Sequence, residues 1–396
     1  MVRVVGIDPG SRSIDICGLC NGKVCFEKSI DTVEASRNPE KLIKALEEFG
    51  EFDVVVAPSG YGVEVKWIND IPRELFSDWY LTFILLTTRD EIDSAVSKGI
   101  EGALIYDAMV KLASFLRNKE IPALLIPGVI NLSTIPLHRK INKVDMGTAD
   151  KLAVAVLGIH EVADKEDTDY SSVNYIHVEM GYGYNAVIAV SGGRIVDGVG
   201  GSLTPGPAYL TAGSLDLEVV QAIGSFSKAD VFTTGCLTYV NLDLDNWLRN
   251  PYIDRKSEIC FEAMIESVIK AINMVIPSVE KPSLILLSGR VSKYSSVREV
   301  LQDKLKNYPS LDIMRGLKNA VSVKETAQGY AVVGDGLLNG VFGELIDHVM
   351  IRDAEGSSLD YILIPKFFQT PLGRMFVKLR GYFRKPAFNL LWWGYY

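Results

Sequence analysis

The stretch GIDPGSRSIDICGLCNGK, residues 6–23, decides the fold because it sets an acidic tight turn between two apolar segments. The segments at 2–7 and 14–19 predict two strands, and Asn21-Gly22 predicts a two-residue hairpin turn into a third strand at 24–26. Asp8 then stands at a strand end, beside a polar turn over residues 10–13. Backbone N–H groups and hydroxyls next to a fixed carboxylate suit a phosphate with its metal ion.

The bulk composition describes an ordinary globular chain. Its 396 residues are 48% hydrophobic and 23% charged, with a net charge of −8. This length suits two domains plus an extension, and the acidic balance disfavours a nucleic-acid partner. No apolar run approaches the roughly 20 residues of a transmembrane helix, and no signal peptide precedes the first strand. We therefore expect a cytoplasmic protein without a transmembrane segment.

The cysteines predict neither a disulfide framework nor a metal cluster. Five is an odd number in a chain of this size, which argues against a framework of paired cysteines. Cys17, Cys20 and Cys25 are close in sequence. However, Cys17 and Cys20 differ by three positions, so on a strand they point to opposite faces.

A second stretch, VEMGYGYNAVIAVSGGR at residues 178–194, repeats the pattern of the first. When Glu179 is aligned with Asp8, Gly181 falls on Gly10, and the hairpin signal at 192–193 falls on the one at 21–22. Each copy is followed by alternating helix and strand signals, an order typical of a ribonuclease-H-like unit. The sequence therefore predicts an α/β fold with two duplicated domains and an interdomain cleft, a common place for a ligand.

We expect the first ribonuclease-H-like domain over residues 1–143, with an insertion at about 61–119, and the second over residues 144–343. A basic, aromatic C-terminal extension follows over residues 344–396. From Tyr361 onward it has six basic residues and no acidic one, which leaves a net charge of −14 for the rest of the chain. This predicts docking on the acidic body or on another subunit, as in a homodimer. The alternative is contact with an anionic surface such as a membrane.

At these motifs the chain resembles the actin, sugar-kinase, heat-shock-chaperone and acetate-kinase superfamily, over about residues 1–343. Members of that superfamily share duplicated ribonuclease-H-like domains that close on Mg²⁺ and ATP. The resemblance implies that residues 8–13 and 179–185 are the two phosphate loops, and that LSGR at 287–290 is the adenosine loop. Within the superfamily, the pattern is similar to a family of predicted butyrate kinases.

The resemblance also implies roles for individual residues. Asp8 and Glu179 would hold Mg²⁺, although the second loop normally carries Asp where this chain has Glu179. Arg12 would neutralise charge on the transferred phosphoryl group. The residues expected to bind the nucleotide are Gly10, Ser11, Ser13, Glu179, Gly181, Tyr182, Gly183, Ser288, Gly289 and Arg290.

The stretch HRKINKVDMGTADKLAVA at residues 138–155 leads into a predicted helix. In the superfamily an acid near this helix start acts as a base or orients water, and we favour Asp150 over Asp145 for that role. A helix-dipole interaction would explain either acid without catalysis. Arg139 and Lys140 would bind an anionic substrate, or they form a solvated basic face.

The leading interpretation is an ATP-dependent small-molecule kinase for a carboxylate or a hydroxyl compound. Carboxylate kinases carry an Arg in a loop comparable to residues 201–218, and its absence here disfavours acetate or butyrate. A non-kinase ATPase that acts on a partner protein would share every ATP-site residue. GIDPGSR also resembles the first catalytic strand of Holliday-junction resolvases, but the duplication and the acidic charge disfavour a nuclease.

Overall fold

The computed structural model describes residues 1–394, and the chain divides into two compact units. Unit 1 contains Met1–Glu161 and Gly316–Tyr396, and unit 2 contains Val162–Arg315. These limits differ from the predicted domain boundaries at 143/144 and 343/344, because a compact unit also takes in the helices and the extension that pack on it. The boundaries of the duplication itself stay a prediction.

The sheet of unit 1 begins with the predicted acidic hairpin. Its strands are β1 (Arg3–Pro9), β2 (Ser13–Cys20), β3 (Lys23–Asp31), β4 (Val54–Val56), β5 (Lys66–Trp67) and β6 (Ala123–Leu125), in the order β3-β2-β1-β4-β6-β5. β1 pairs antiparallel with β2 and parallel with β4. Asn21 and Gly22 have φ angles of 55° and 76°, the left-handed conformation that a two-residue hairpin turn requires.

The sheet of unit 2 repeats this order. Its strands are β7 (Tyr175–Met180), β8 (Asn185–Ser191), β9 (Arg194–Gly200), β10 (Leu284–Ser288) and β11 (Ser310–Ile313), in the order β11-β10-β7-β8-β9. β7 pairs antiparallel with β8 and parallel with β10, so β7 corresponds to β1. Both units therefore have a three-stranded antiparallel start followed by parallel strands, and unit 1 adds the two-residue strand β5, which is antiparallel to β6. This confirms the predicted α/β class with two ribonuclease-H-like folds.

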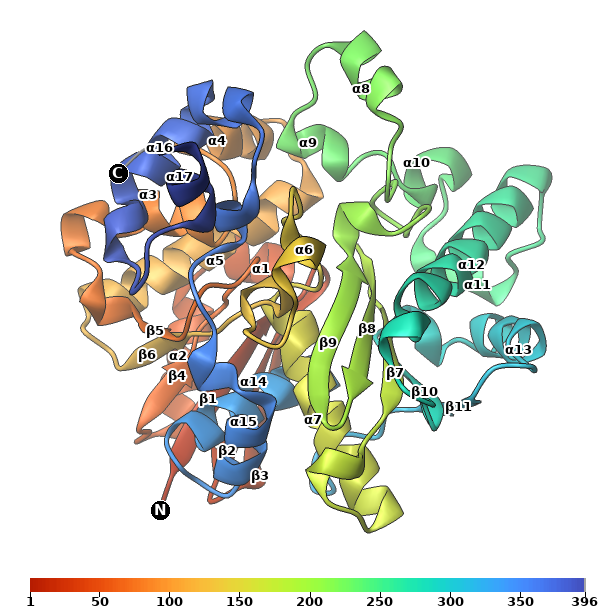
Figure 1. Ribbon diagram of the computed structural model, residues 1–396, viewed down its shortest axis with the longest axis horizontal. Coiled ribbons are helices and arrows are strands. Elements are labelled where there is room, and N and C mark those ends of the chain that lie inside the picture. Colours follow the sequence, from red (N-terminus) through yellow and green to blue (C-terminus); the bar gives the residue numbers. More distant parts are fainter. Residues whose placement is uncertain (395–396) are drawn as a thin grey trace. The chain divides into compact units, whose positions relative to one another are not determined.

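Helices flank both sheets (Figure 1). In the first half and the C-terminal part of the chain they are α1 (Thr32–Arg37), α2 (Glu40–Phe49), α3 (Arg73–Phe83), α4 (Arg89–Ser97), α5 (Glu101–Asn118), α6 (Leu137–Lys140), α7 (Ala149–Glu166), α14 (Glu325–Leu337), α15 (Gly343–Val349), α16 (Pro371–Leu379) and α17 (Phe388–Trp393). In unit 2 they are α8 (Leu217–Ile223), α9 (Lys228–Val231), α10 (Cys236–Val240), α11 (Leu244–Arg249), α12 (Arg255–Val275) and α13 (Ser295–Lys304). Among the described residues, no helix combines the length and hydropathy needed to cross a membrane.

Helix α14 packs directly on the acidic hairpin because both surfaces carry small residues. A Cβ atom on Gly6 of β1 would lie 2.4 Å from the backbone N of Ala331, and one on Gly334 would lie 2.4 Å from Cγ2 of Val56. Atoms this close would force the helix off the sheet. The close approach places the first residues of α14 beside the Asp8 turn.

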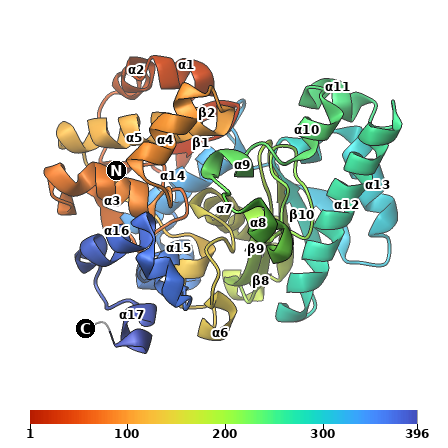
Figure 2. The ribbon, with the colours of Figure 1, turned by 90° about the horizontal axis from the view of Figure 1, so that it is seen from above.

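The C-terminal extension packs on the insertion of unit 1. α16 lies beside α3 in both views (Figures 1 and 2). The ring of Phe383 lies 5.5 Å from Trp79 and 4.8 Å from Phe83. Trp79 and Tyr80 of the insertion are fully buried in this core. Residues 395 and 396 of the extension lie outside the described residues.

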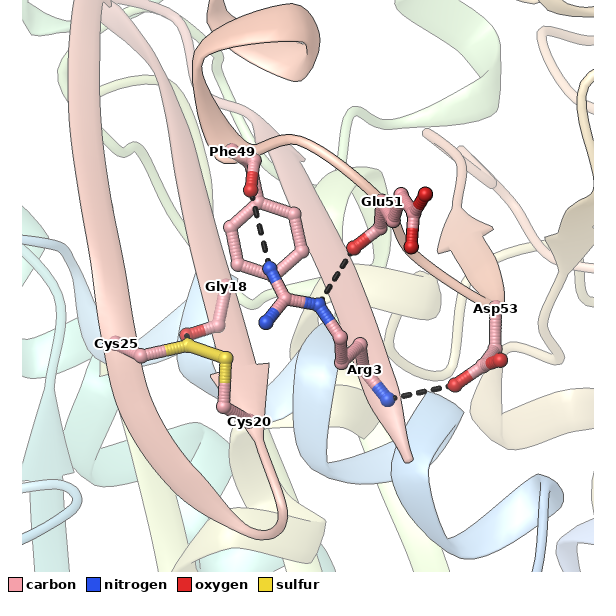
Figure 3. The surroundings of a disulfide bond; sticks show 7 residues. All are labelled: Arg3, Gly18, Cys20, Cys25, Phe49, Glu51 and Asp53. Carbon is pink, nitrogen blue, oxygen red and sulfur yellow. Dashed lines mark hydrogen bonds between the residues drawn. A yellow bond between two sulfur atoms is a disulfide. The ribbon is translucent and has the colours of Figure 1, made fainter. Parts of the chain in front are cut away.

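A disulfide joins Cys20 and Cys25 at the end of the first hairpin, with a Cα–Cα distance of 5.9 Å (Figure 3). This bond was not expected from the sequence, although one disulfide is not the framework of paired cysteines that the cysteine count argues against. The register shifts between Gly18 and Leu19, and the resulting bulge leaves Cys25 without a paired residue opposite it. A regular ladder, which the sequence pattern assumes, does not contain this shift. Cys17, Cys236 and Cys260 are free and buried.

Candidate functional site

The acidic turn of unit 1 contains two carboxylates and an unexpected lysine. Asp8 on β1 pairs with Asp15 on β2, and the two residues are 4% and 2% exposed. Lys324, the residue before α14, places its Nζ 2.7 Å from Oδ2 of Asp15 and 3.8 Å from Oδ2 of Asp8. The same Nζ donates a hydrogen bond to the carbonyl O of Ser13 at 3.2 Å. Neither Asp15 nor Lys324 was expected from the sequence.

This environment is unfavourable for a negative charge on Asp8. Burial raises the pKa of Asp8 from 3.8 to about 7, and the charges of Asp150 and Asp15 add to that rise. The ammonium groups of Lys324 and Lys151 lower the pKa but do not compensate fully. A cation bound at Asp8 would offset the remaining cost, so the residues present fit a metal ion.

The polar turn of residues 10–13 has both engaged and exposed groups. The Ser13 hydroxyl donates to Oδ2 of Asp15 at 2.8 Å, and the carbonyl of Gly10 accepts from Thr32 Oγ1 at 2.7 Å. Ser11 is half-buried, whereas Arg12 is exposed. Phosphate binding by Gly10, Ser11 and Ser13, and charge neutralisation by Arg12, stay predictions.

Asp150 lies in the first turn of α7 and within electrostatic reach of Asp8. Its Oδ2 accepts from Nζ of Lys151 at 2.6 Å, and its Oδ1 accepts from the Thr148 hydroxyl. Burial acts to raise the pKa of Asp150, but the Lys151 charge and the bonds from Lys151 and Thr148 outweigh it and hold the pKa below 3.8. Asp150 is thus an ionised acceptor at neutral pH.

A tight crossing of loops fixes the start of α7. Gly62 has a φ of 84°, and a Cβ on it would lie 1.8 Å from the backbone N of Gly128. Two backbone hydrogen bonds of 2.9 Å also join these loops to the segment before α7. Ala149 N donates to the Gly60 carbonyl, and Val129 N donates to the Gly147 carbonyl. No side chain fits at this crossing, so Gly62 lets the loops hold Asp150 in place.

Asp145 has a different environment from Asp150. It is 7% exposed, and its Oδ1 accepts from the backbone N of Gly147 at 3.0 Å. Its charge contributes to the raised pKa of Tyr61, after the larger effect of burial. The geometry therefore favours Asp150 over Asp145 as the acid that acts together with Asp8, and the assignment stays a prediction.

Lys140 does not lie on a solvated basic face. It is 5% exposed, and its Nζ donates to the Leu132 carbonyl at 2.8 Å and lies 4.9 Å from the Tyr361 ring centre. Burial lowers its pKa to about 8, while the charges of Glu355 and Asp360 act in the opposite direction. Arg139 is half-buried. Substrate binding by Arg139 and Lys140 stays a prediction, and Lys140 also has a structural role under the extension.

In unit 2, the second acid turn and the LSGR loop adjoin each other. Glu179 is 4% exposed and lies beside Ser288 in the parallel pair β7–β10. Gly289 has a φ of 86°, and a Cβ on it would lie 2.4 Å from the Met180 carbonyl and 2.8 Å from Oε1 of Glu179. Gly289 is thus required by the fold of unit 2 itself, because any side chain at this position would strain the loop. Oγ of Ser288 lies 2.9 Å from Nε2 of His177.

The remaining predicted residues of unit 2 form the turn between β7 and β8. The backbone N of Gly181 donates to the Tyr184 carbonyl at 2.9 Å, and the Gly183 carbonyl accepts from Thr211 Oγ1 at 3.0 Å. The Tyr182 ring packs edge-on against Tyr209, 5.0 Å between centres. Arg290 is half-buried. Nucleotide binding by these residues stays a prediction.

Asn185, the first residue of β8, was missed by the sequence reasoning. It is 2% exposed, and neither its Nδ2 nor its Oδ1 has a hydrogen-bond partner within the described part of the chain. A buried amide without partners is costly and calls for an explanation. It pairs in register with Met180, next to Glu179. The signal in the sequence is a lone polar residue at the start of the apolar run AVIAV.

Within residues 1–394, no group of three or more His, Cys, Asp or Glu side chains is arranged to hold a metal ion alone. Asp8 in unit 1 and Glu179 in unit 2 stay the predicted metal ligands.

Solved structures of similar fold include two acetate kinases and a propionate kinase. Acetate kinase from Entamoeba histolytica is 14% identical, with a TM-score of 0.50 over 77% of this chain and 86% of that chain. A propionate kinase from Francisella tularensis subsp. tularensis SCHU S4 is 12% identical, with a TM-score of 0.55 over 84% and 98% of the two chains. Porphyromonas gingivalis acetate kinase is 12% identical, with a TM-score of 0.53 over 83% and 98%. At these identities the likeness shows the fold alone, and it agrees with the predicted α/β fold of two duplicated domains.

Sequence comparison gives a family but no characterised relative. No protein with a curated description matches the chain significantly. Residues 6–364 match the family described as "Protein of unknown function (DUF1464)". Since this match spans most of the 396 residues, the chain belongs to the DUF1464 family.

Proposed function

We propose that this chain is an ATP-dependent phosphotransferase that acts on a small molecule. The observation that supports this most directly is the cluster in unit 1. Asp8 and Asp15 share the ammonium group of Lys324, and Asp150, whose charge acts on Asp8, is paired with Lys151. Phosphoryl transfer depends on such positioned charges rather than on covalent chemistry by the protein.

The residues of unit 1 take distinct roles in this proposal. Asp8 would hold Mg²⁺, which when bound neutralises charge on the phosphate oxygens. Arg12 is exposed and free to approach the transferred phosphoryl group. Asp150 would accept a hydrogen bond from the attacking group and orient it, because its carboxylate stays ionised at neutral pH.

Unit 2 would supply the nucleotide loops. The turn with Glu179, Gly181, Tyr182 and Gly183 would bind phosphate and metal, and Ser288 to Arg290 would contact the adenosine. The support for this role is that Gly289 lies against Met180 and Glu179, so the two loops are in direct contact. Asn185, which pairs with Met180 next to Glu179, is buried without a hydrogen-bond partner among the described residues, and this also supports a polar ligand beside these loops.

The acceptor is proposed to be a hydroxyl compound or a carboxylate of the acetate or butyrate kind. A hydroxyl acceptor needs a group that takes or orients its proton, which Asp150 offers. A carboxylate acceptor needs a cation instead, and the loop at 201–218 has no Arg. We therefore favour a hydroxyl acceptor over a butyrate-like one.

An ATP-consumption screen with short acids, sugars and polyols tests this proposal. Asp8→Asn and Asp150→Asn should lose the acceptor-dependent rate, and Asp93→Asn, an exposed acid on α4, should keep it. If no compound raises ATP consumption above the basal rate, or if Asp8→Asn keeps the rate, the kinase proposal is wrong.

The second candidate is an ATPase that acts on a partner protein. The observation that favours it is α8, which has no buried residue and exposes Leu217 by 79%, Val219 by 51% and Ile223 by 54%. Exposed apolar groups gathered on one segment are typical of an interaction surface. ATP hydrolysis without any small acceptor, reduced by Asp8→Asn, would favour this candidate. The cytoplasmic location, a homodimer and contact of the tail with an anionic surface stay predictions.

A further inference from the structure

Lys324 forms ion pairs with both carboxylates of the Asp8 turn, and it comes from the C-terminal segment of unit 1. Its Nζ lies 2.7 Å from Asp15 and 3.8 Å from Asp8, and its side chain is 26% exposed. The two carboxylates are nearly inaccessible, at 3% and 6% side-chain exposure. When both are ionised, one ammonium leaves the group with a net negative charge.

The segment before Lys324 is anchored by a single carboxylate on β3. Oε1 of Glu27 accepts from the backbone N of Val321 at 2.9 Å and from Val323 N at 3.2 Å, and both oxygens accept from Ser322 N at 3.2 Å. Partial burial acts to raise the pKa of Glu27, but these bonds outweigh it and hold the pKa below its ordinary value. The backbone leading to Lys324 is thus fixed while its side chain extends over the turn.

The turn leaves space for the ammonium group because residue 10 has no side chain. A Cβ on Gly10 would lie 2.6 Å from Nζ of Lys324 and 3.5 Å from Oδ2 of Asp8. The ammonium therefore occupies the mouth of the turn, where the backbone N–H groups and Ser11 would meet a phosphate. Because the ammonium group is partly exposed and lies next to buried carboxylates, it can pair either with those carboxylates or with the phosphate of a ligand.

We propose that Lys324 is an internal counter-cation for Asp8 and Asp15 that shifts to the phosphate oxygens of the nucleotide when Mg²⁺ takes its place beside Asp8. This inference rests on the proposed function and adds a positioning residue to it. The inference predicts that Lys324 has opposite effects on the binding of a cation and of an anion. Lys324 should oppose the binding of a free cation at Asp8 and support the binding of an anion at the same turn.

The test measures two probes by calorimetry on the full chain: Mg²⁺ alone, and ADP in excess EDTA. Lys324→Met should bind Mg²⁺ roughly tenfold tighter and ADP roughly tenfold weaker, the scale of one unit charge removed at about 4 Å. Lys324→Arg should stay close to the unsubstituted protein for both probes. Lys28→Met, which removes an exposed ion pair with Glu48, is the matched control and should change neither affinity.

If Lys324→Met changes the affinities for Mg²⁺ and ADP in the same direction, relative to the unsubstituted protein, the inference is overturned. If that variant does not fold, Asp15→Asn/Lys324→Met removes the charge together with its nearest partner. The double variant should still bind ADP roughly tenfold more weakly, and unchanged ADP affinity overturns the inference. If the unsubstituted protein binds no ADP with or without Mg²⁺, the proposed function itself fails, an outcome that the variants do not affect.

Discussion

Asp8 and Asp15 stand directly opposite each other across the antiparallel pair β1–β2, and both side chains are buried. Like charges at directly opposed strand positions destabilise a sheet. The fold keeps them because Lys324 lies between them, although one ammonium does not fully offset two carboxylates. The free energy that this arrangement costs in the ligand-free protein is available to bind a cation.

The first prediction concerns turnover. Asp8→Asn keeps the shape of the turn but removes the charge proposed to hold the metal ion. The acceptor-dependent rate should fall by roughly 10³-fold or more, about 4 kcal/mol in the barrier. Steady-state rates at saturating ATP and Mg²⁺ check this, with Asp93→Asn as the exposed control. A normal rate in Asp8→Asn would remove the basis for the phosphate-loop interpretation.

The second prediction concerns the stability of the ligand-free protein. Because the pKa of Asp8 is about 7 in the folded state against 3.8 ordinarily, the native state holds a proton that the unfolded state releases between these values. Stability should therefore decline as the pH rises from about 4 to about 7. Asp8→Asn carries no such charge, so its melting temperature should exceed that of the unsubstituted protein at pH 8 by about 2 °C or more.

The difference between the two proteins should shrink as the pH falls toward 4, because Asp8 is then protonated in the folded state and increasingly protonated in the unfolded state. Thermal melting across this range, with EDTA present, measures the difference. Added Mg²⁺ should stabilise the unsubstituted protein at pH 8 and leave Asp8→Asn unchanged. A variant that is less stable than the parent at pH 8 would show that the Asp8 charge is not a cost to the fold.

The third prediction uses the unpartnered amide of Asn185. Asn185→Leu keeps a similar volume and removes two buried polar atoms that have no partner, so the melting temperature should rise by about 2 °C. Asn174→Leu is the matched control. Asn174 Oδ1 accepts from Ser191 Oγ and from Gly192 N, so its loss should destabilise the protein.

If Asn185 serves a nucleotide, Asn185→Leu should also bind Mg·ATP more weakly, by roughly tenfold for one lost hydrogen bond to a charged group. Calorimetry measures this on the same sample. Greater stability with unchanged nucleotide affinity would mean that the amide has no role in binding.

The hairpins, the duplicated strand order and the acid turns could be predicted because they depend on local chemistry. Asn21-Gly22 specifies its turn through two residues alone, and the alternation of apolar residues predicts the strands on either side. Lys324 could not be found this way, because it meets Ser13 across a separation of 311 residues. Motif spacing predicts contacts between residues close in sequence and does not predict a contact over this separation.

Other residues were interpreted by type, and their environment proved different. Tyr182 stands in a predicted nucleotide loop, yet its ring packs against Tyr209. Lys140 belongs to a basic run, yet it is buried under the extension. In both cases tertiary packing decides the contacts of a side chain whose chemistry alone allows several roles.

The fourth prediction concerns the extension. Arg380 and Asp360 form a two-pronged ion pair of 2.8 and 2.6 Å with side chains 4% and 5% exposed. Arg380→Met leaves a buried carboxylate without its cation and should cost about 3–5 kcal/mol of unfolding free energy. Asp360→Asn/Arg380→Met should cost less, because no charge remains in the core. Denaturant unfolding of both variants measures the difference, and a double variant as unstable as Arg380→Met would contradict the charge argument.

The last prediction concerns Asp150 and the lysine beside it. Burial acts to raise the pKa of Asp150, and the charge and hydrogen bond of Lys151 are the largest effects that hold it below 3.8. Asp150→Asn should lower turnover by roughly 10²–10⁴-fold with nearly unchanged Mg·ATP affinity. In Lys151→Met the pKa of Asp150 should rise, so the variant should lose activity on the acidic side at a higher pH than the parent. The rates of the two proteins should approach each other as the pH rises and Asp150 becomes ionised in both. Initial rates from pH 5 to 9 test this, with Lys28→Met as the control. A rate reduced by the same factor at every pH would mean that Lys151 contacts the substrate itself rather than acting through Asp150.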